Sequence, residues 1–387
     1  MELKIYPKNS ILNISYSLIA ILQVIMLYGI SSNTTSIISM CTYLFFGLGL
    51  LMFATTIIAT KNWPMRWRVL FVLLIYIYTL LQLVGARRTL KISALSYMLM
   101  LSVWPVASSI KLSDVSRKIT AFMAFIQGAM LIYLSYSEYA YILRNEYNSI
   151  VDSLTLGFPN PNQTAIIIYS TISILIIARE NFKSKFFKFL IFGELVWLFY
   201  LLILTNARIS IFAGFFIVFL DIYHKTKKKQ FKFNENTKLF VFIMSVLPLL
   251  FFWIYNMMYE YKIFADLEIF GKSIYSGRNA LYTTILDRWK NHFFGNMKSF
   301  YFANSHNAAL TILVNTGIVG YALYFMYTYM ELKHLCQKEN TDFLSIVVIL
   351  SYFVIGCAEA AILVSGSIYY VTFLTICILS NNTKNEV

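Results

Sequence analysis

The sequence predicts an all-α polytopic membrane protein, a single integral membrane domain over residues 1–387 with one large polar loop. Hydrophobic residues make up 59% of the chain, and the mean hydropathy is +0.66. Charged residues make up 13%, whereas a soluble domain carries about 25%. The apolar runs are continuous rather than alternating, and this pattern favours transmembrane helices over a β-barrel.

A transmembrane helix needs about 20 consecutive apolar residues to cross the hydrocarbon core, and the apolar runs predict about 12 spans. The seventh and eighth spans are separated only by residues 205–208. A polar loop over about 257–307 separates the ninth and tenth. The expected spans are 11–31, 36–60, 67–85, 90–110, 117–137, 163–179, 186–205, 207–223, 238–257, 307–330, 343–362 and 366–380.

The distribution of lysine and arginine predicts the orientation, because cytoplasmic loops carry an excess of these residues. With both termini in the cytoplasm, the cytoplasmic segments hold 21 of the 32 lysines and arginines. The run from Lys225 to Lys229 decides this assignment, and the loop at 257–307 is then external. The net charge of +14 reflects topology and attraction to anionic membrane lipids, and no nucleic-acid-binding module is recognisable.

The sequence contains no motif that predicts a zinc site or a nucleotide cofactor. The four cysteines form no C-x-x-C pair, so we expect no disulfide and no zinc site. No P-loop or Rossmann glycine pattern is present, and no cofactor is expected. Asp266 and Glu268 form an acidic pair in the external loop that could hold a divalent ion, although a solvated loop is the simpler explanation.

Several arginines lie on the side that the positive-inside rule disfavours. Arg87 and Arg88 occupy a short external loop, where either headgroup contact or a bound pyrophosphate would explain them. Arg208 lies between two strongly apolar spans, and Arg278 and Arg288 lie in the large external loop. Arginine always keeps its charge and grips phosphate oxygens with a two-pronged fork. These residues are therefore candidate ligands for an anionic substrate, with snorkelling side chains as the alternative.

Two prolines and two asparagines lie together in residues 158–164, just before the sixth span. These residues prevent the preceding segment from being helical and then begin a helix, for which Asn162 or Thr164 is the expected cap. In the alternative reading, the amides of Asn160 and Asn162 and the helix N-terminus face an anion or a sugar hydroxyl.

The external loop is expected to contain an amphipathic helix on the external surface. Leu281, Ile285 and Trp289 recur at a spacing of four residues, which is typical of one apolar helix face. Arg278 lies at the start of this helix, directly after Gly277.

The loop ends in Ser305, His306 and Asn307 as the tenth span begins. Histidine is the side chain best suited to take a proton near neutral pH, so His306 is a candidate general base. A histidine at a membrane interface can also be merely amphipathic. Gly317 and Gly320 in the following span would allow close helix packing.

Four of these segments resemble the bacterial O-antigen polymerase and O-antigen ligase superfamily in their order and predicted sidedness. They are the Pro-Asn segment at 159–164, the segment 205–208, Ser276-Gly277-Arg278, and His306-Asn307 with the glycine pattern at 317–320. The resemblance covers about residues 155–325. Ala207 departs from it, because many members have serine before the arginine.

The resemblance implies a glycosyltransferase at the outer face of the bacterial cytoplasmic (inner) membrane. The donor would be an undecaprenyl-pyrophosphate-linked oligosaccharide for capsule, O-antigen or exopolysaccharide. The enzyme would add repeat units to a growing lipid-linked chain without a metal and with inversion. His306, Arg278 and Arg208 would be catalytic, while Asn160, Asn162, Asn307, Arg288, Arg87 and Arg88 would bind substrate. A chain-length regulator and a flippase of the same pathway would be partners.

Two other functions remain open from the sequence. A ligase of the same superfamily would move finished glycan to a different acceptor. A flippase or transporter of lipid-linked glycan would suit about twelve spans, with Glu194 and Glu359 as coupling groups inside spans. The long external loop argues against the transporter.

Overall fold

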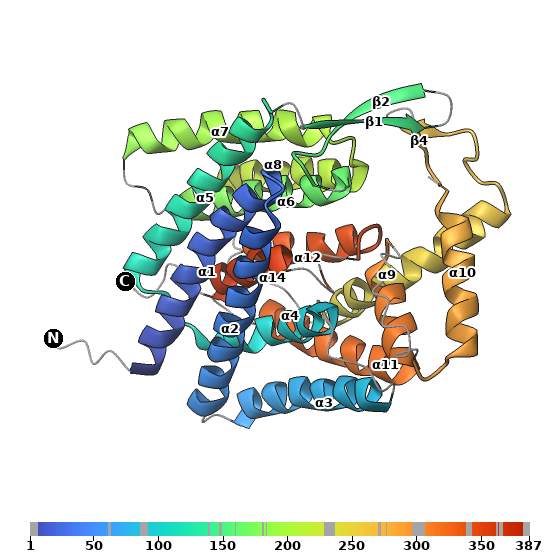
Figure 1. Ribbon diagram of the computed structural model, residues 1–387, viewed down its shortest axis with the longest axis horizontal. Helices are drawn as coiled ribbons and strands as arrows, with labels where there is room; N and C mark the ends of the chain where they lie inside the picture. The colour runs from blue at the N-terminus through green and yellow to red at the C-terminus, as the bar shows by residue number, and fades with distance from the viewer. Residues whose placement is uncertain are drawn as a thin grey trace.

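The structure is a computed structural model of the chain (Figure 1). The structure describes residues 7–60, 63–85, 92–137, 140–146, 149–158, 160–179, 182, 184–227, 237–269, 272–275, 277–295, 306–337, 343–360, 363 and 367–381.

Helices occupy every range that the sequence predicts as a span. They are α1 (Pro7–Ser31), α2 (Thr35–Ala59), α3 (Trp63–Gly85), α4 (Ile92–Ser109), α5 (Asp114–Leu134), α6 (Pro161–Ala178), α7 (Lys185–Leu204), α8 (Arg208–Lys227), α9 (Thr237–Glu260), α11 (Ala308–Gln337), α12 (Phe343–Gly356) and α14 (Ser367–Asn381). The predicted helix of the polar loop is also present, as α10 (Arg278–Asn291).

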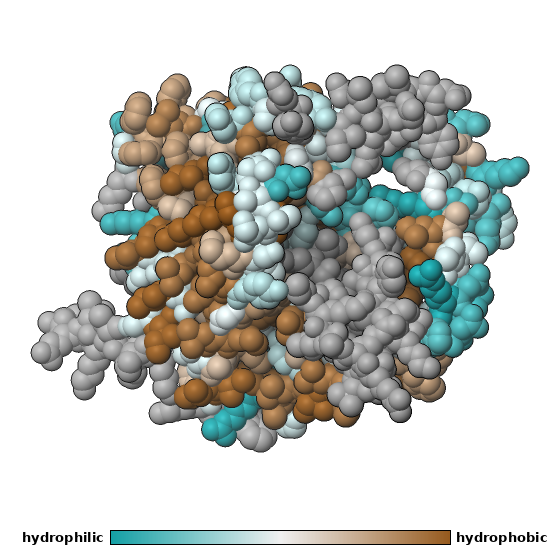
Figure 2. All heavy atoms as spheres, in the orientation of Figure 1, coloured by the Kyte–Doolittle hydropathy of each residue, from teal (hydrophilic) through white to brown (hydrophobic). Residues whose placement is uncertain are grey.

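Eight of the helices are long and apolar enough to cross a membrane, so the chain is an α-helical membrane protein. They are α1, α2, α3, α5, α6, α7, α9 and α11. Within the described residues, α4, α12 and α14 have shorter apolar stretches, and α8 is not among the eight. The expectation of about twelve spans is thus supported in part. Apolar side chains cover α1, α2 and α5, whereas hydrophilic ones gather around α10 (Figure 2).

Two β-hairpins lie at one end of the helix bundle, and the sequence had not predicted them. β1 (Tyr141–Glu146) pairs antiparallel with β2 (Ser149–Leu154), and β3 (Glu268–Ile269) pairs with β4 (Lys272–Ser273). We call this the hairpin end. Here α6, α8 and α11 begin, and α7, α9 and α12 end (Figure 1).

The helix α12 lies deep in the bundle and positions the residues that follow it at the hairpin end. It packs against α8, α9 and α14, and nearly all of its side chains are buried. Ser170 and Tyr352 share a hydrogen bond of 2.7 Å between α6 and α12, and Tyr169 pairs with Ser351 in the same way. Hydroxyls buried away from water need such partners, so these pairs fix the register of the two helices.

Ion pairs join helices at the opposite end of the bundle. Arg179, after α6, donates from one guanidinium nitrogen to both carboxylate oxygens of Asp221 on α8 at 2.7 Å. Arg68 on α3 forms a two-pronged pair with Glu331 on α11. A buried charge is tolerated only when it is paired, so these contacts hold α3 to α11 and α6 to α8.

Candidate functional site

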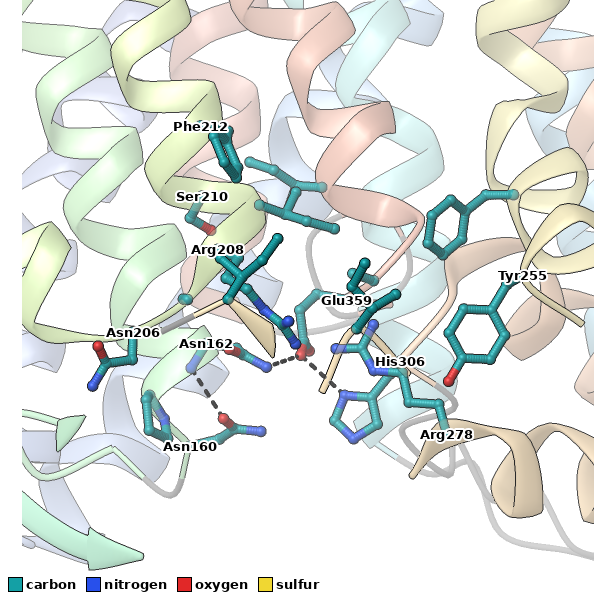
Figure 3. Close-up of a pocket in the computed structure, with 18 of the residues that line it drawn as sticks. Asn160, Asn162, Asn206, Arg208, Ser210, Phe212, Tyr255, Arg278, His306 and Glu359 are labelled. Atoms are coloured by element: carbon teal, nitrogen blue, oxygen red, sulfur yellow. Dashed lines mark hydrogen bonds and ion pairs between the residues drawn. The ribbon is translucent and has the colours of Figure 1, made fainter. Parts of the chain in front are cut away.

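A cavity of about 820 Å³ opens at the hairpin end, where several elements of the bundle converge (Figure 3). Its walls come from the starts of α6, α8 and α10, the ends of α9 and α12, the strand β3, and His306 just ahead of α11. Its polar lining residues are Asn160, Asn162, Asn206, Arg208, Ser210, Tyr255, Arg278, His306 and Glu359. The structure thus brings together all three residues that the sequence predicts as catalytic.

Arg208 is the first residue of α8 and follows a tight turn from α7. Asn206 takes a left-handed conformation with φ 54°, and Thr205 donates to the carbonyl of Leu202 at 2.6 Å. Both terminal nitrogens of Arg208 donate to the carbonyl oxygen of Ser273 on β4, each at 3.2 Å. These hydrogen bonds orient the guanidinium, which is directed into the cavity (Figure 3).

Arg278 is the first residue of α10, directly after Gly277 in the left-handed conformation with φ 68°. The helix is anchored by Tyr282, whose ring is fully buried against Phe252 and Tyr255 of α9. Burial raises the pKa of the Tyr282 hydroxyl, and the neighbouring charge of Arg278 opposes that rise. The side chain of Arg278 points toward the same part of the cavity as that of Arg208 (Figure 3).

The predicted amphipathic helix is confirmed in its position, but its apolar face packs against protein. Leu281 and Ile285 join the aromatic cluster at the end of α9, and Trp289 packs against the main core. These contacts hold α10 against α9 and α11, and Arg278 is fixed at the edge of the cavity as a result.

His306 lies two residues before the start of α11 and contacts Glu359. Its Nδ1 is 3.0 Å from Oε1 of Glu359, and Asn162 donates to the same oxygen from Nδ2 at 2.6 Å (Figure 3). Glu359 is buried, whereas a quarter of the His306 side chain is exposed to the cavity. Because a carboxylate only accepts, this hydrogen bond puts the imidazole proton on Nδ1. The neutral ring then carries its lone pair on Nε2, as a general base requires.

The structure adds Glu359 to the site, a residue that the sequence suggested only as a coupling group of a transporter. It follows the end of α12, and Oε2 is buried without a hydrogen-bond partner among the described residues. Glu359 therefore reaches the cavity mainly through Oε1, the oxygen that it shares with His306 and Asn162. The only signal in the sequence was an acid within an apolar segment.

The asparagines at the start of α6 have different roles. Asn160 caps the helix, its Oδ1 accepting from the backbone N–H of Asn162 at 3.0 Å. The expectation of a cap at Asn162 or Thr164 is therefore wrong. Thr164 instead donates to the carbonyl of Thr155 at 2.6 Å, and Asn162 faces the cavity.

Asn307 is fully buried and bonds to backbone on three sides. Its Nδ2 donates to the carbonyls of Pro248 at 2.7 Å and Cys357 at 3.2 Å, and its Oδ1 accepts from the N–H of Leu310. These bonds tie the start of α11 to α9 and to the end of α12. The residue thereby fixes His306 and Glu359 relative to each other.

Other predicted substrate-binding residues lie elsewhere. Arg288 is exposed near the end of α10, ten residues and about 15 Å along the helix from Arg278, and it does not line the cavity. Arg87 and Arg88 lie outside the described residues. Asp266 and Glu268 are exposed, and the described part of the chain contains no cluster of three or more potential metal ligands.

Gly317 breaks α11 and accommodates the segment that follows α10. With φ 69°, it lies where a Cβ atom would be 2.1 Å from the carbonyl carbon of Phe294. The N–H of Ile318 donates to the carbonyl of Phe293 at 3.0 Å, and Tyr78 of α3 donates to the carbonyl of Thr316 at 2.8 Å. The expectation that Gly317 serves helix packing is wrong, because its neighbour is this connecting segment.

Gly320 does serve close helix packing, as the sequence predicts. A Cβ atom there would approach a ring carbon of Tyr78 on α3 to 2.9 Å. This contact brings α3 close enough for Tyr78 to reach the break in α11.

Comparison with known proteins identifies no relative of the chain. No protein-family model matches the chain, and no curated protein or solved structure matches it.

Proposed function

We propose that the protein is a polysaccharide polymerase that transfers glycan repeat units from undecaprenyl pyrophosphate to a growing lipid-linked chain. The observation that carries the proposal is the convergence of Arg208, Arg278 and His306 in one cavity. They come from three segments distant in sequence, and two fixed cations beside a held imidazole suit an anionic leaving group and a hydroxyl nucleophile.

In the proposed reaction, Nε2 of His306 takes the proton from an acceptor hydroxyl. The hydroxyl oxygen forms a bond to the anomeric carbon, and the bond from that carbon to the pyrophosphate oxygen breaks. The electron pair leaves with the lipid pyrophosphate, and one direct displacement inverts the anomeric centre. The carboxylate of Glu359 stabilises the imidazolium that forms.

Arg208 and Arg278 would act on the leaving group. Negative charge grows on the pyrophosphate as the bond breaks, and preplaced donors in a partly dry site stabilise it without reorganising. One such donor is typically worth about 3–4 kcal/mol in the transition state. Hydrogen bonds to Ser273 fix Arg208, and the buried Tyr282 anchors the helix that carries Arg278.

The proposed location of the site is the outer face of the cytoplasmic membrane. The excess of lysine and arginine in the segments at the opposite end supports this orientation. Asn162, which lines the cavity, would then bind hydroxyls of the donor or acceptor sugar.

A flippase or transporter of lipid-linked glycan is the alternative from another class, and one observation favours it. Glu194 of α7 is buried inside the bundle, with its carboxylate against Gly128 of α5. Such acids inside a membrane commonly couple proton movement.

Reconstitution distinguishes these functions. Purified protein in proteoliposomes receives an undecaprenyl-pyrophosphate-linked repeat unit as its only substrate, and chain length and released undecaprenyl pyrophosphate are measured. Polymerase activity gives chains longer than one repeat, with one lipid pyrophosphate released for each bond. Glycan transfer only after addition of a different acceptor would show a ligase, and movement of unchanged donor across the bilayer would show a flippase. Either result would overturn the proposal.

A further inference from the structure

The cavity has an apolar wall that continues into the helix bundle. Phe212 lies one helical turn beyond Arg208 on α8, and Phe251 lies one turn before Tyr255 on α9. Ile355, near the end of α12, also lines the cavity. One turn of helix is about 5.4 Å long, so the apolar wall begins at Phe212, only about one turn along α8 from Arg208.

The exposure pattern of α12 indicates where this wall meets the surroundings. Every residue of Phe343–Gly356 is buried or half-buried except Val354, which is 40% exposed. Val354 lies next to Ile355 and four residues before Ala358, and both of these neighbours line the cavity. The deep helix therefore reaches the surface at one point, close to the cavity.

The neighbouring helices leave this point uncovered. α8 and α9 both pack against α12, whereas their described parts make no comparable packing with each other. Phe212 on α8 is 61% exposed and Leu250 on α9 is 39% exposed. We call the surface formed by Phe212, Phe251, Val354 and Ile355 the lateral slot.

We infer that the lateral slot binds the long isoprenoid chain of the lipid-linked donor, which enters sideways from the membrane. This inference rests on the proposed function. The slot is continuous with the cavity that holds Arg208 and Arg278, so a pyrophosphate held there would direct its chain along Phe212 and toward Val354. An amphiphile with two phosphates matches two arginines on separate elements better than a phospholipid with one phosphate does.

Photocrosslinking tests the binding site without any need for catalysis. A benzophenone amino acid replaces Val354 in one variant and Val196 in another. Val196 is 55% exposed on α7 and serves as a matched valine outside the cavity. The variants are placed in phosphatidylglycerol vesicles with radiolabelled undecaprenyl pyrophosphate. We expect labelling at 354 that excess unlabelled undecaprenyl pyrophosphate displaces and geranyl pyrophosphate does not.

Two crosslinking results would overturn the inference. Equal labelling at 354 and 196 would mean that the probe samples the whole lipid-facing surface. Displacement by geranyl pyrophosphate as effective as that by the long-chain lipid would mean that only the head group is bound. A displaceable crosslink in a protein that makes no polymer would retain the slot and reject the proposed polymerase.

Chain-length dependence of turnover provides the second test. Val354→Trp fills the slot, and Val196→Trp adds the same bulk to the surface of α7. We expect Val354→Trp to lower kcat/KM for an undecaprenyl-linked donor by about tenfold relative to the same glycan on a geranyl carrier, because several isoprene contacts are lost. The Val196→Trp variant should leave that ratio unchanged. An unchanged ratio in Val354→Trp, with polymerisation intact in the wild type, would overturn the slot alone.

Discussion

Nδ1 of His306 lies 3.0 Å from Oε1 of Glu359, although the two residues are 53 positions apart and belong to different helix ends. The contact orients the imidazole and assigns its proton to Nδ1. Asn162 donates to the same carboxylate oxygen, and the start of α6 therefore also supports the pair. In the proposed mechanism, His306 is the base and Glu359 is its positioning partner.

Replacing Glu359 tests this relationship. Glu359→Gln keeps the size and an acceptor but removes the charge that stabilises the imidazolium. A charge-assisted hydrogen bond is worth about 1–2 kcal/mol more than a neutral one, so we expect a drop of about 5- to 30-fold in the rate of repeat addition. Glu260→Gln, at an exposed residue ending α9, is the matched control. Wild-type turnover in Glu359→Gln would remove Glu359 from the mechanism.

The base itself should be far more sensitive. We expect His306→Ala to lower polymerisation by about 100- to 10,000-fold and to leave single repeat units on the lipid carrier. His292→Ala is the control, because His292 ends α10 as an exposed residue outside the cavity. Electrophoresis of the lipid-linked products measures both effects. Normal chain lengths in His306→Ala, with the protein inserted normally, would leave His306 an interfacial helix residue.

Substitution of the arginines by lysine separates charge from geometry. Arg208→Lys and Arg278→Lys keep the charge but lose the two-pronged fork, and we expect each to reduce turnover by at least about tenfold. Arg66→Lys, at an exposed residue near the start of α3, should have little effect. The measurement is release of undecaprenyl pyrophosphate by purified protein. If both lysine variants release it at the wild-type rate, a clamp on the pyrophosphate is the wrong mechanism.

The break in α11 should be intolerant of a side chain. Gly317→Ala forces a Cβ atom against Phe294 and puts an L-residue at a positive φ, so we expect a loss of about 2 kcal/mol or more in stability. Gly193→Ala is the matched control, because a Cβ atom there meets nothing within 4 Å. Thermal unfolding in detergent compares the two variants. Equal melting temperatures would show that the segment after α10 does not depend on this contact.

The sequence predicted the helices well because apolar runs of membrane length are local signals. The helix at α10 was also predictable, since Leu281, Ile285 and Trp289 mark one face. The β1–β2 hairpin was missed because its six-residue strands carry a weak and partly polar pattern. Local composition likewise gave no indication that Gly317 would break α11, since the conformation depends on a segment that packs there from α10.

The site was predictable in its residues but not in their contacts. Arg208, Arg278 and His306 stood out because charged groups near apolar spans are costly and require a reason. Glu359 gave the same signal, yet its partner could be identified only when α12 and α11 were placed side by side. The cap at Asn160 was missed because several residues of the Pro-Asn segment could serve, and the backbone conformation selects among them.

The orientation of the cavity decides whether it can meet an external donor, and cysteine labelling tests it. All four native cysteines are buried, so they should give little background. Tyr261→Cys places an exposed thiol at the hairpin end after α9, and Lys111→Cys places one at an exposed position between α4 and α5 at the opposite end. With the excess of basic residues inside, an impermeant maleimide should label Tyr261→Cys on intact cells and Lys111→Cys only after permeabilisation. The reverse pattern would put Arg208, Arg278 and His306 on the cytoplasmic side, where an external lipid-linked donor could not reach them, and would contradict the proposed mechanism as a whole.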